Sequence, residues 1–153
     1  MLGRYISDLE KGDVFNPVEY VITPFMCSEY AHGTEEAWEG FHSPNSPVGR
    51  QIRPPTMIHV DKMRILEHNC DEERRIAGMK GPDARVHYEY RAKHHSAAYV
   101  GETVIVSGHI VDKYVKRERT FLHYYLEVRT SDGRLVTTYN DLTLLRYKPI
   151  GVN

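Results

Sequence analysis

The sequence predicts an α+β domain in which an antiparallel sheet accompanies one central helix. From residue 85 onward, hydrophobic residues alternate with polar ones over several long segments, and such alternation is typical of strands. Residues 56–70 instead space their hydrophobic residues at the intervals of a largely buried helix. Consecutive strands after a single helix favour an antiparallel α+β arrangement. The 153 residues fit one domain, which we expect to cover residues 1–153.

The first part of the chain predicts a turn, a short strand and a short helix. Residues 7–15 contain Lys-Gly-Asp, which indicates a turn that leads into a strand. Residues 18–22 alternate and predict a strand. Thr23 followed by Pro24 marks the start of a helix, because threonine caps helices and proline suits their first position. We expect this helix to end near Gly33.

Residues 33–55 form a long connection without a periodic pattern, rich in proline and glycine. Connections of this length without regular structure are uncommon and often functional. This one carries several carboxylates and a histidine, among them Glu36 and His42. Histidine titrates near neutral pH, so a carboxylate and an imidazole on one loop form a candidate acid/base pair.

The sheet is predicted from segments that follow the central helix. Residues 71–83 form a charged link and residues 93–102 a connection. Gly108 interrupts an alternating segment, which indicates a bulge or close packing. Ser131-Asp132-Gly133-Arg134 has the composition of a hairpin turn. The predicted strands cover residues 85–92, 103–116, 119–130 and 135–147.

Composition restricts the class of protein. The formal net charge of −1 disfavours nucleic acid or an anionic membrane as the main partner. Cys27 and Cys70 are too few for a disulfide framework and lack metal-ligand spacing. The first residues hold no apolar signal region, and no apolar run approaches the ~18 residues needed to span a bilayer. We therefore expect a cytoplasmic protein with reduced thiols.

Several short motifs follow in order along the chain, among them Leu9-Glu10-Lys11-Gly12-Asp13 near its start and Ile52-Arg53-Pro54-Pro55-Thr56 before the central helix. The first is similar to the opening "l-x-x-G-D", and the second to the "I-A-P-P-T" before the central helix, of the MaoC-like dehydratases and (R)-specific enoyl-CoA hydratases, which have the hot-dog fold. The other matching motifs are Tyr20-Val21-Ile22-Thr23 with Glu29-Tyr30-Ala31, residues 99–104, and residues 131–136.

The resemblance implies a sheet of five or more strands wrapped around the helix at residues 56–70. It also implies a homodimer or higher homo-oligomer, formed by extension of the sheet. The ligands would be acyl thioesters of coenzyme A or acyl carrier protein, and the reaction the reversible hydration of an enoyl thioester to a 3-hydroxyacyl thioester. We expect no metal and no other cofactor.

The family's active loop reads G-D-x-N-P-x-H, and this chain departs from it. Counted from Tyr30-Ala31, the position of the family's Asp falls on Glu36 and that of its His on Phe41, one residue before His42. The resemblance makes Glu36 and His42 the candidate catalytic pair. A carboxylate and a histidine are present at altered spacing.

The substrate site implied by the resemblance includes Trp38, Phe41, Pro55 and Thr56. The two aromatic residues could line an acyl channel or simply pack beneath the loop. The family polarises the thioester carbonyl with a backbone N–H at the start of the central helix. Pro55 stands where the catalytic branch has Gly and has no N–H to donate. Thr56 could provide its amide instead.

Three functions remain open at this point. The first is an enoyl-thioester hydratase or dehydratase. The second is a non-catalytic thioester-binding subunit in a heterodimer with a canonical dehydratase chain, which the altered loop and Pro55 favour. The third is a thioesterase that would use Glu67 or Asp61 as its carboxylate.

Two further clusters have mainly structural interpretations. The pair His94-His95 is too isolated for a metal site, because adjacent histidines rarely converge on one ion. The basic residues between Lys113 and Arg119 suit a solvated hairpin end. Contact with the phosphates of coenzyme A is their functional alternative.

Overall fold

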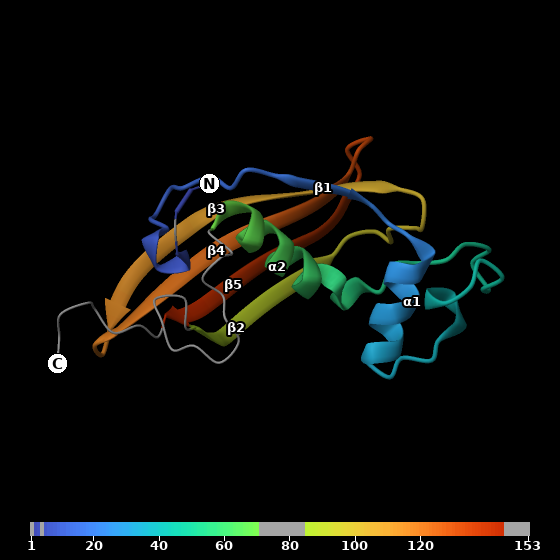
Figure 1. Ribbon diagram of the computed structural model, residues 1–153, viewed down its shortest axis with the longest axis horizontal. Coiled ribbons are helices and arrows are strands. Elements are labelled where there is room, and N and C mark those ends of the chain that lie inside the picture. The colour runs from blue at the N-terminus through green and yellow to red at the C-terminus, as the bar shows by residue number, and fades with distance from the viewer. Residues whose placement is uncertain (1, 4, 71–84, 146–153) are drawn as a thin grey trace.

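The computed structural model describes residues 2–3, 5–70 and 85–145. It confirms the α+β prediction: five antiparallel strands form one sheet in the order β1-β3-β4-β5-β2. Figure 1 shows the long strands running side by side, with α2 lying across one face of the sheet. Helix α1 lies beyond the end of the sheet, next to the loop that follows it. The strands are β1 (Val18–Val21), β2 (Arg85–His94), β3 (Thr103–Lys116), β4 (Arg119–Thr130) and β5 (Leu135–Leu145).

Helix α2 (Ile58–Asn69) follows a short 3-10 turn, η3 (Pro55–Met57). It buries Ile58, Ile65 and Leu66 against the inward residues of the sheet. These inward residues alternate along the strands, as the sequence pattern predicts; they include Val104, Val106, Ile110, Leu122, Tyr124, Leu126, Val128 and Tyr139. The helix predicted at residues 56–70 is therefore α2, and its buried face forms part of the hydrophobic core.

Helix α1 (Pro24–Gly33) begins as the sequence predicts. The Oγ1 of Thr23 accepts a hydrogen bond from the backbone N–H of Met26, 3.2 Å away, and Pro24 occupies the first position. The connection after it is irregular except for a 3-10 turn, η2 (Glu39–Phe41). Before β1, the chain contains another 3-10 turn, η1 (Ile6–Asp8), and Val14 makes only an isolated bridge to His109.

Gly108 shows the close packing that its place in a strand indicates. A Cβ atom there would lie 2.0 Å from the carbonyl oxygen of Tyr125 on the neighbouring strand. The register shift in β3 comes later, between Ile110 and Asp112. The hairpin between β4 and β5 has Gly133 in the left-handed region, at φ +93°, as Asp-Gly turn chemistry predicts.

Two predicted segments reach beyond the described residues. The link at 71–83 lies wholly outside them, and the last predicted strand, to residue 147, is described only to Leu145. In the described ranges, no helix is both long and apolar enough to cross a bilayer.

Candidate functional site

A short extended segment, Gln51 to Arg53, joins the loop to the sheet side of the molecule. The backbone N–H of Ile52 donates to the carbonyl of Gly40 (2.8 Å), and that of Arg53 donates to the carbonyl of Ala98 (2.9 Å). The buried amide of Gln51 donates to the carbonyls of Phe41 and Pro24. The loop, the start of α1 and the β2–β3 connection are therefore held together just before α2 begins.

The structure brings the two predicted catalytic residues together through the backbone of one of them. The Nε2 of His42 lies 2.9 Å from the carbonyl oxygen of Glu36, and its Nδ1 lies 3.1 Å from the Oγ of Ser28. A carbonyl can only accept, so Nε2 donates to it, and Nδ1 is left to accept from the serine hydroxyl. The carboxylate of Glu36 accepts from the N–H of Trp38, 3.0 Å away. The imidazole is thus fixed in one tautomer, and Nδ1 is its basic nitrogen.

The two aromatic residues of the loop contact each other. The rings of Trp38 and Phe41 meet edge to face, with centroids 4.8 Å apart. Gly40 makes room for them, since a Cβ there would lie 2.0 Å from the indole. Trp38 remains 41% exposed. This apolar pair is available at the surface of the loop.

Pro55 and Thr56 lie where the loop meets the start of α2. The Tyr30 hydroxyl, from α1, donates to the Oγ1 of Thr56 at 3.0 Å. Both Pro55 and Thr56 are exposed. The hydroxyl of Thr56 thus links the two helices at the surface.

A buried charge network lies directly behind them. The Nη1 of Arg53 is 2.6 Å from the Oδ2 of Asp61, and these side chains are 1% and 0% exposed. Nη1 also donates to the Tyr20 hydroxyl (2.5 Å), which in turn donates to the Oδ1 of Asp61 (2.5 Å). Burial raises the pKa of Tyr20, and the Asp61 charge raises it further. Burial opposes the charge of Arg53, but Asp61 and Tyr20 outweigh it and raise the guanidinium pKa.

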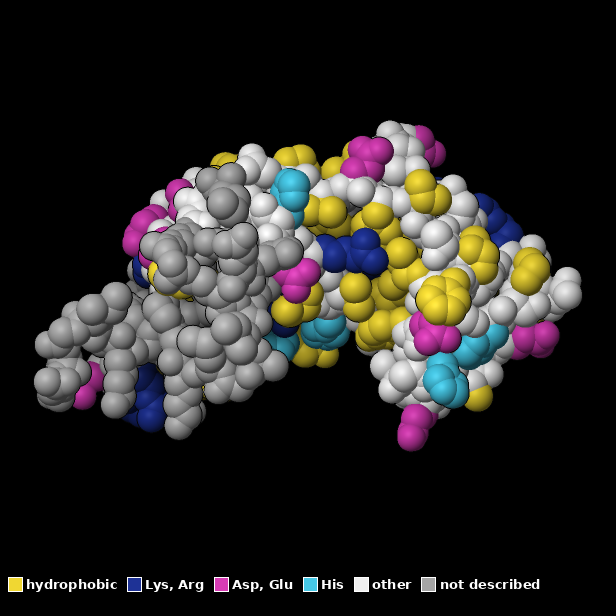
Figure 2. All heavy atoms as spheres, in the orientation of Figure 1, with side chains coloured by type: hydrophobic (Ala, Val, Ile, Leu, Met, Phe, Trp, Pro, Cys, Tyr) yellow, Lys and Arg dark blue, Asp and Glu magenta, His cyan; other side chains and the backbone are white. Residues whose placement is uncertain are grey.

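A cavity of about 300 Å³ opens beside this network. Arg53 and Pro55 border it together with Ser96 and the exposed His94; its other lining residues are Ile52, His95, Ala97, Ala98, Val136 and Thr137. The Nδ1 of His94 lies 3.2 Å from the hydroxyl of Thr137. Partial burial, and next the charge of Arg53, lower the pKa of His94, so its ring is neutral at pH 7. Figure 2 shows hydrophobic side chains gathered between α2 and α1, where the outline of the molecule is notched.

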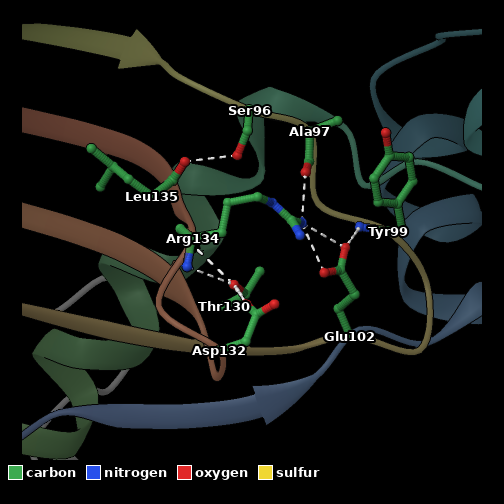
Figure 3. Close-up of polar contacts among 8 residues, drawn as sticks. All are labelled: Ser96, Ala97, Tyr99, Glu102, Thr130, Asp132, Arg134 and Leu135. Carbon is green, nitrogen blue, oxygen red and sulfur yellow. Dashed lines mark hydrogen bonds and ion pairs between the residues drawn. The ribbon is translucent and has the colours of Figure 1, made fainter.

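One wall of the cavity is fixed by ion pairing and hydrogen bonds, shown in Figure 3. The Nη2 of Arg134, from the β4–β5 hairpin, donates to both carboxylate oxygens of Glu102 (2.8 Å each) and to the carbonyl of Ala97 (3.1 Å). The hydroxyl of Ser96 donates to the carbonyl of Leu135 at 2.7 Å. The β2–β3 connection is therefore held at several points by a different part of the sheet.

A second titratable cluster lies between α2 and the last strands. The carboxylate of Asp141 is fully buried and accepts hydrogen bonds from the hydroxyls of Tyr139 and Thr143. Its Oδ2 lies 3.0 Å from the Nε2 of His87 and 3.5 Å from the Nζ of Lys62. These donors satisfy the buried charge, as a buried carboxylate requires.

Sequence reasoning named Asp61 only as a possible thioesterase carboxylate and Arg53 only as part of a motif, and it missed that the two form a buried pair. They are eight positions apart and on either side of a helix start, and the sequence favours Asp61 as a polar residue at a helix edge. The one signal was Arg53 itself, a charged residue where the family motif has Ala. Of the predicted residues, Pro55 alone borders the cavity in the described part of the chain.

No family model matches the chain, and no curated protein matches its sequence. Solved structures do match. The 3R-hydroxyacyl-ACP dehydratase complex HadBC from Mycobacterium tuberculosis superposes with a TM-score of 0.71 at 14% identity, covering 88% of this chain and 96% of the other. A MaoC-like dehydratase from Rhodospirillum rubrum gives 0.70 at 12% identity, covering 95% and 99%.

An (R)-hydratase from Pseudomonas aeruginosa, in the unliganded form, gives a TM-score of 0.72 at 9% identity. The match covers 98% of this chain and 97% of the (R)-hydratase chain. At such identities the likeness is one of fold. It covers nearly the whole chain, so the hot-dog prediction is confirmed: this protein has the fold of the MaoC-like dehydratases and (R)-hydratases.

Proposed function

We propose that this protein adds water to, or removes it from, acyl thioesters, converting between enoyl and 3-hydroxyacyl forms. The observation that carries the proposal is the convergence of the loop of His42, the start of α2 and a cavity at Pro55. The hydratases and dehydratases of the same fold support it. The carrier would be coenzyme A or acyl carrier protein.

In this proposal Glu36 and His42 hold the reacting water. The imidazole is oriented by its hydrogen bond to the carbonyl of Glu36, as a general base must be. Its Nδ1 takes a proton from water as the oxygen bonds to C3 of the enoyl group. The electron pair of the C2–C3 double bond moves toward the thioester carbonyl and then returns, and C2 takes up the proton that Nδ1 accepted from the water. Water reaches Nδ1 where the hydroxyl of Ser28 now lies, 3.1 Å away, so that hydroxyl must turn aside.

The test is turnover of crotonyl-CoA and longer enoyl-CoA substrates, followed by loss of the enoyl absorbance. The general-base role predicts that His42→Ala lowers kcat by about 100-fold or more. His32→Ala is a matched control, because His32 is an exposed histidine at the end of α1. Turnover by the wild type that His42→Ala leaves unchanged would remove the loop from the mechanism. No turnover at all would contradict the enzyme proposal.

A second candidate is a non-catalytic thioester-binding subunit paired with a canonical dehydratase chain. The hydrogen bonds at both nitrogens of His42 and the missing N–H of Pro55 favour it. The solved HadBC dehydratase is itself described as a complex. Co-purification from the native source tests this candidate. A purely homomeric particle that hydrates crotonyl-CoA would exclude it.

In either case we propose that β2 supplies the interface. Among the described residues it is the outer strand of the sheet beyond β5, which positions the backbone groups on its outer side to pair with a second chain. Two of its aromatic side chains are unusually exposed, Tyr88 at 62% and Tyr90 at 47%. A homodimer formed by extension of the sheet would cover them.

A further inference from the structure

We propose that Arg53 is the group that binds and polarises the thioester carbonyl of a short acyl chain held in the cavity at Pro55. The inference rests on the proposed thioester function and names a residue for it. It starts from an unsatisfied atom: the Nη2 of Arg53 is buried and has no hydrogen-bond partner in the described part of the protein. A buried donor left unpaired destabilises the folded state.

The arrangement of the guanidinium directs Nη2 to a ligand. Its other terminal nitrogen, Nη1, is committed to Asp61 and Tyr20 at 2.6 and 2.5 Å. Arg53 borders the cavity, and its charge acts on His94, another lining residue. Nη2 is therefore the unpaired donor of a guanidinium whose residue borders the cavity.

Charge identifies the kind of acceptor. Asp61 already neutralises Arg53, and the remaining lining is largely apolar, including Ile52, Ala98 and Val136. A carboxylate would add an unbalanced negative charge at this buried pair, which is costly. A neutral carbonyl oxygen accepts one hydrogen bond without such a cost. When negative charge develops on that oxygen during addition to C3, the adjacent guanidinium favours it.

The same residue resolves the difficulty at Pro55. A proline at this position cannot donate its backbone nitrogen. Arg53 lies two residues earlier, and its side chain replaces the absent backbone donor with a charged one. A cavity of about 300 Å³ is at the lower end of the range for ligand pockets, roughly 300–1,000 Å³. Short acyl groups are therefore the expected substrates.

The direct test is the infrared carbonyl band of bound butyryl-CoA labelled with a heavy isotope in its carbonyl. This saturated thioester cannot be hydrated, so the measurement does not depend on turnover. We expect the band of the bound ligand to lie at lower frequency than in solution. In Arg53→Lys, which retains a charge for Asp61 but lacks the second nitrogen, the band should return toward its solution position. Arg50→Lys, whose exposed guanidinium lies over the ring of Tyr99 at 3.8 Å, is the matched control and should leave it unchanged.

Turnover gives the second readout. Loss of one such donor should lower kcat/KM for crotonyl-CoA by about 100-fold in Arg53→Lys and leave Arg50→Lys unaffected. If Arg53→Lys does not fold, the double variant Arg53→Met with Asp61→Leu replaces the pair by apolar residues, a change that is often tolerated. It should bind butyryl-CoA without the band shift.

The outcomes separate the two proposals. Wild-type protein that binds butyryl-CoA with its band at the solution position overturns the role of Arg53. So does a shift that persists in both the lysine variant and the apolar double variant. Wild-type protein that neither binds butyryl-CoA nor hydrates crotonyl-CoA overturns the thioester function, and the role of Arg53 with it.

Discussion

The Nη1 of Arg53 lies 2.6 Å from the Oδ2 of Asp61, and neither side chain has appreciable contact with water. The pair joins the segment before α2 to the first turn of that helix. Tyr20 adds β1 to the same network through hydrogen bonds to both partners. The segment before α2, α2 itself and β1 are thus joined at one buried ion pair.

The first prediction concerns the loss of one member of this pair. Asp61→Ala leaves the guanidinium of Arg53 buried without its counter-charge, so the free energy of unfolding should fall by about 3–5 kcal/mol. Denaturation in urea measures the change. Asp112→Ala is the control, because the Asp112 contact with Lys11 is 3.7 Å long and exposed, and such pairs contribute about 0–1 kcal/mol. Equal losses in the two variants would show that Asp61 is not an essential partner.

The second prediction concerns Gly108. Gly108→Ala places a methyl group 2.0 Å from the carbonyl oxygen of Tyr125, which forces β3 and β4 apart. We expect a loss of stability of about 1–3 kcal/mol and a lower melting temperature. Gly33→Ala, at the end of α1, meets no atom within 4 Å and should be neutral or slightly stabilising. A melting temperature unchanged by Gly108→Ala would contradict the close approach of the strands.

The strands and helices could be predicted from local pattern, whereas the site could not. Thr23-Pro24 capping and the alternation in 103–116 and 119–130 depend on neighbouring residues, and both gave bounds close to those observed. The Arg53–Asp61 contact depends on the path of the chain between a loop and a helix. The interaction of Asp141 with Lys62 joins residues 79 positions apart. No local pattern indicates such pairings.

The loop illustrates the same limit. The motif resemblance drew attention to Glu36 and His42, and the structure does place them in contact through the carbonyl of Glu36. Which nitrogen of His42 donates is set by the carbonyl of Glu36, and the other nitrogen meets Ser28, fourteen residues earlier on α1. The exchange of a family alanine for Arg53 was visible in the sequence, but its burial was not. A residue that departs from a family motif at a helix start is therefore worth testing as a replacement for a missing group, as Arg53 is for the absent N–H of Pro55.

The third prediction concerns pH. His59 on α2 faces Lys62, His87, Tyr90, Tyr139 and Asp141. Burial, and then the charges of Lys62 and His87, lower the His59 pKa below its ordinary 6.5. The unfolded chain therefore binds this proton at a higher pH than the folded one does. The contribution of His59 to stability is complete above about pH 6.5 and is lost as the pH falls toward the lowered value.

His59→Gln should thus weaken the dependence of the melting temperature on pH between about 7.5 and 5. The exposed His32 offers the control, His32→Gln, which should leave the dependence as in the wild type. A steeper or unchanged profile in His59→Gln would mean that the folded protein does not exclude the proton at this site.

The last prediction concerns assembly through β2. Tyr88 is 62% exposed on this outer strand and touches Phe121 edge to face, with centroids 5.3 Å apart. A lysine at a sheet edge opposes pairing with another chain, so Tyr88→Lys should weaken the proposed dimer. Sedimentation velocity across a concentration series would then show a dissociation constant raised by about tenfold or more, equivalent to about 1.4 kcal/mol. Tyr114→Lys is the control, since Tyr114 stacks on the same Phe121 but lies on β3, on the opposite side of the sheet from β2. If both variants dissociate equally, the interface involves the sheet face around Phe121 and not the β2 edge. A wild-type protein that stays monomeric at all concentrations would contradict a homodimer and favour pairing with a different chain.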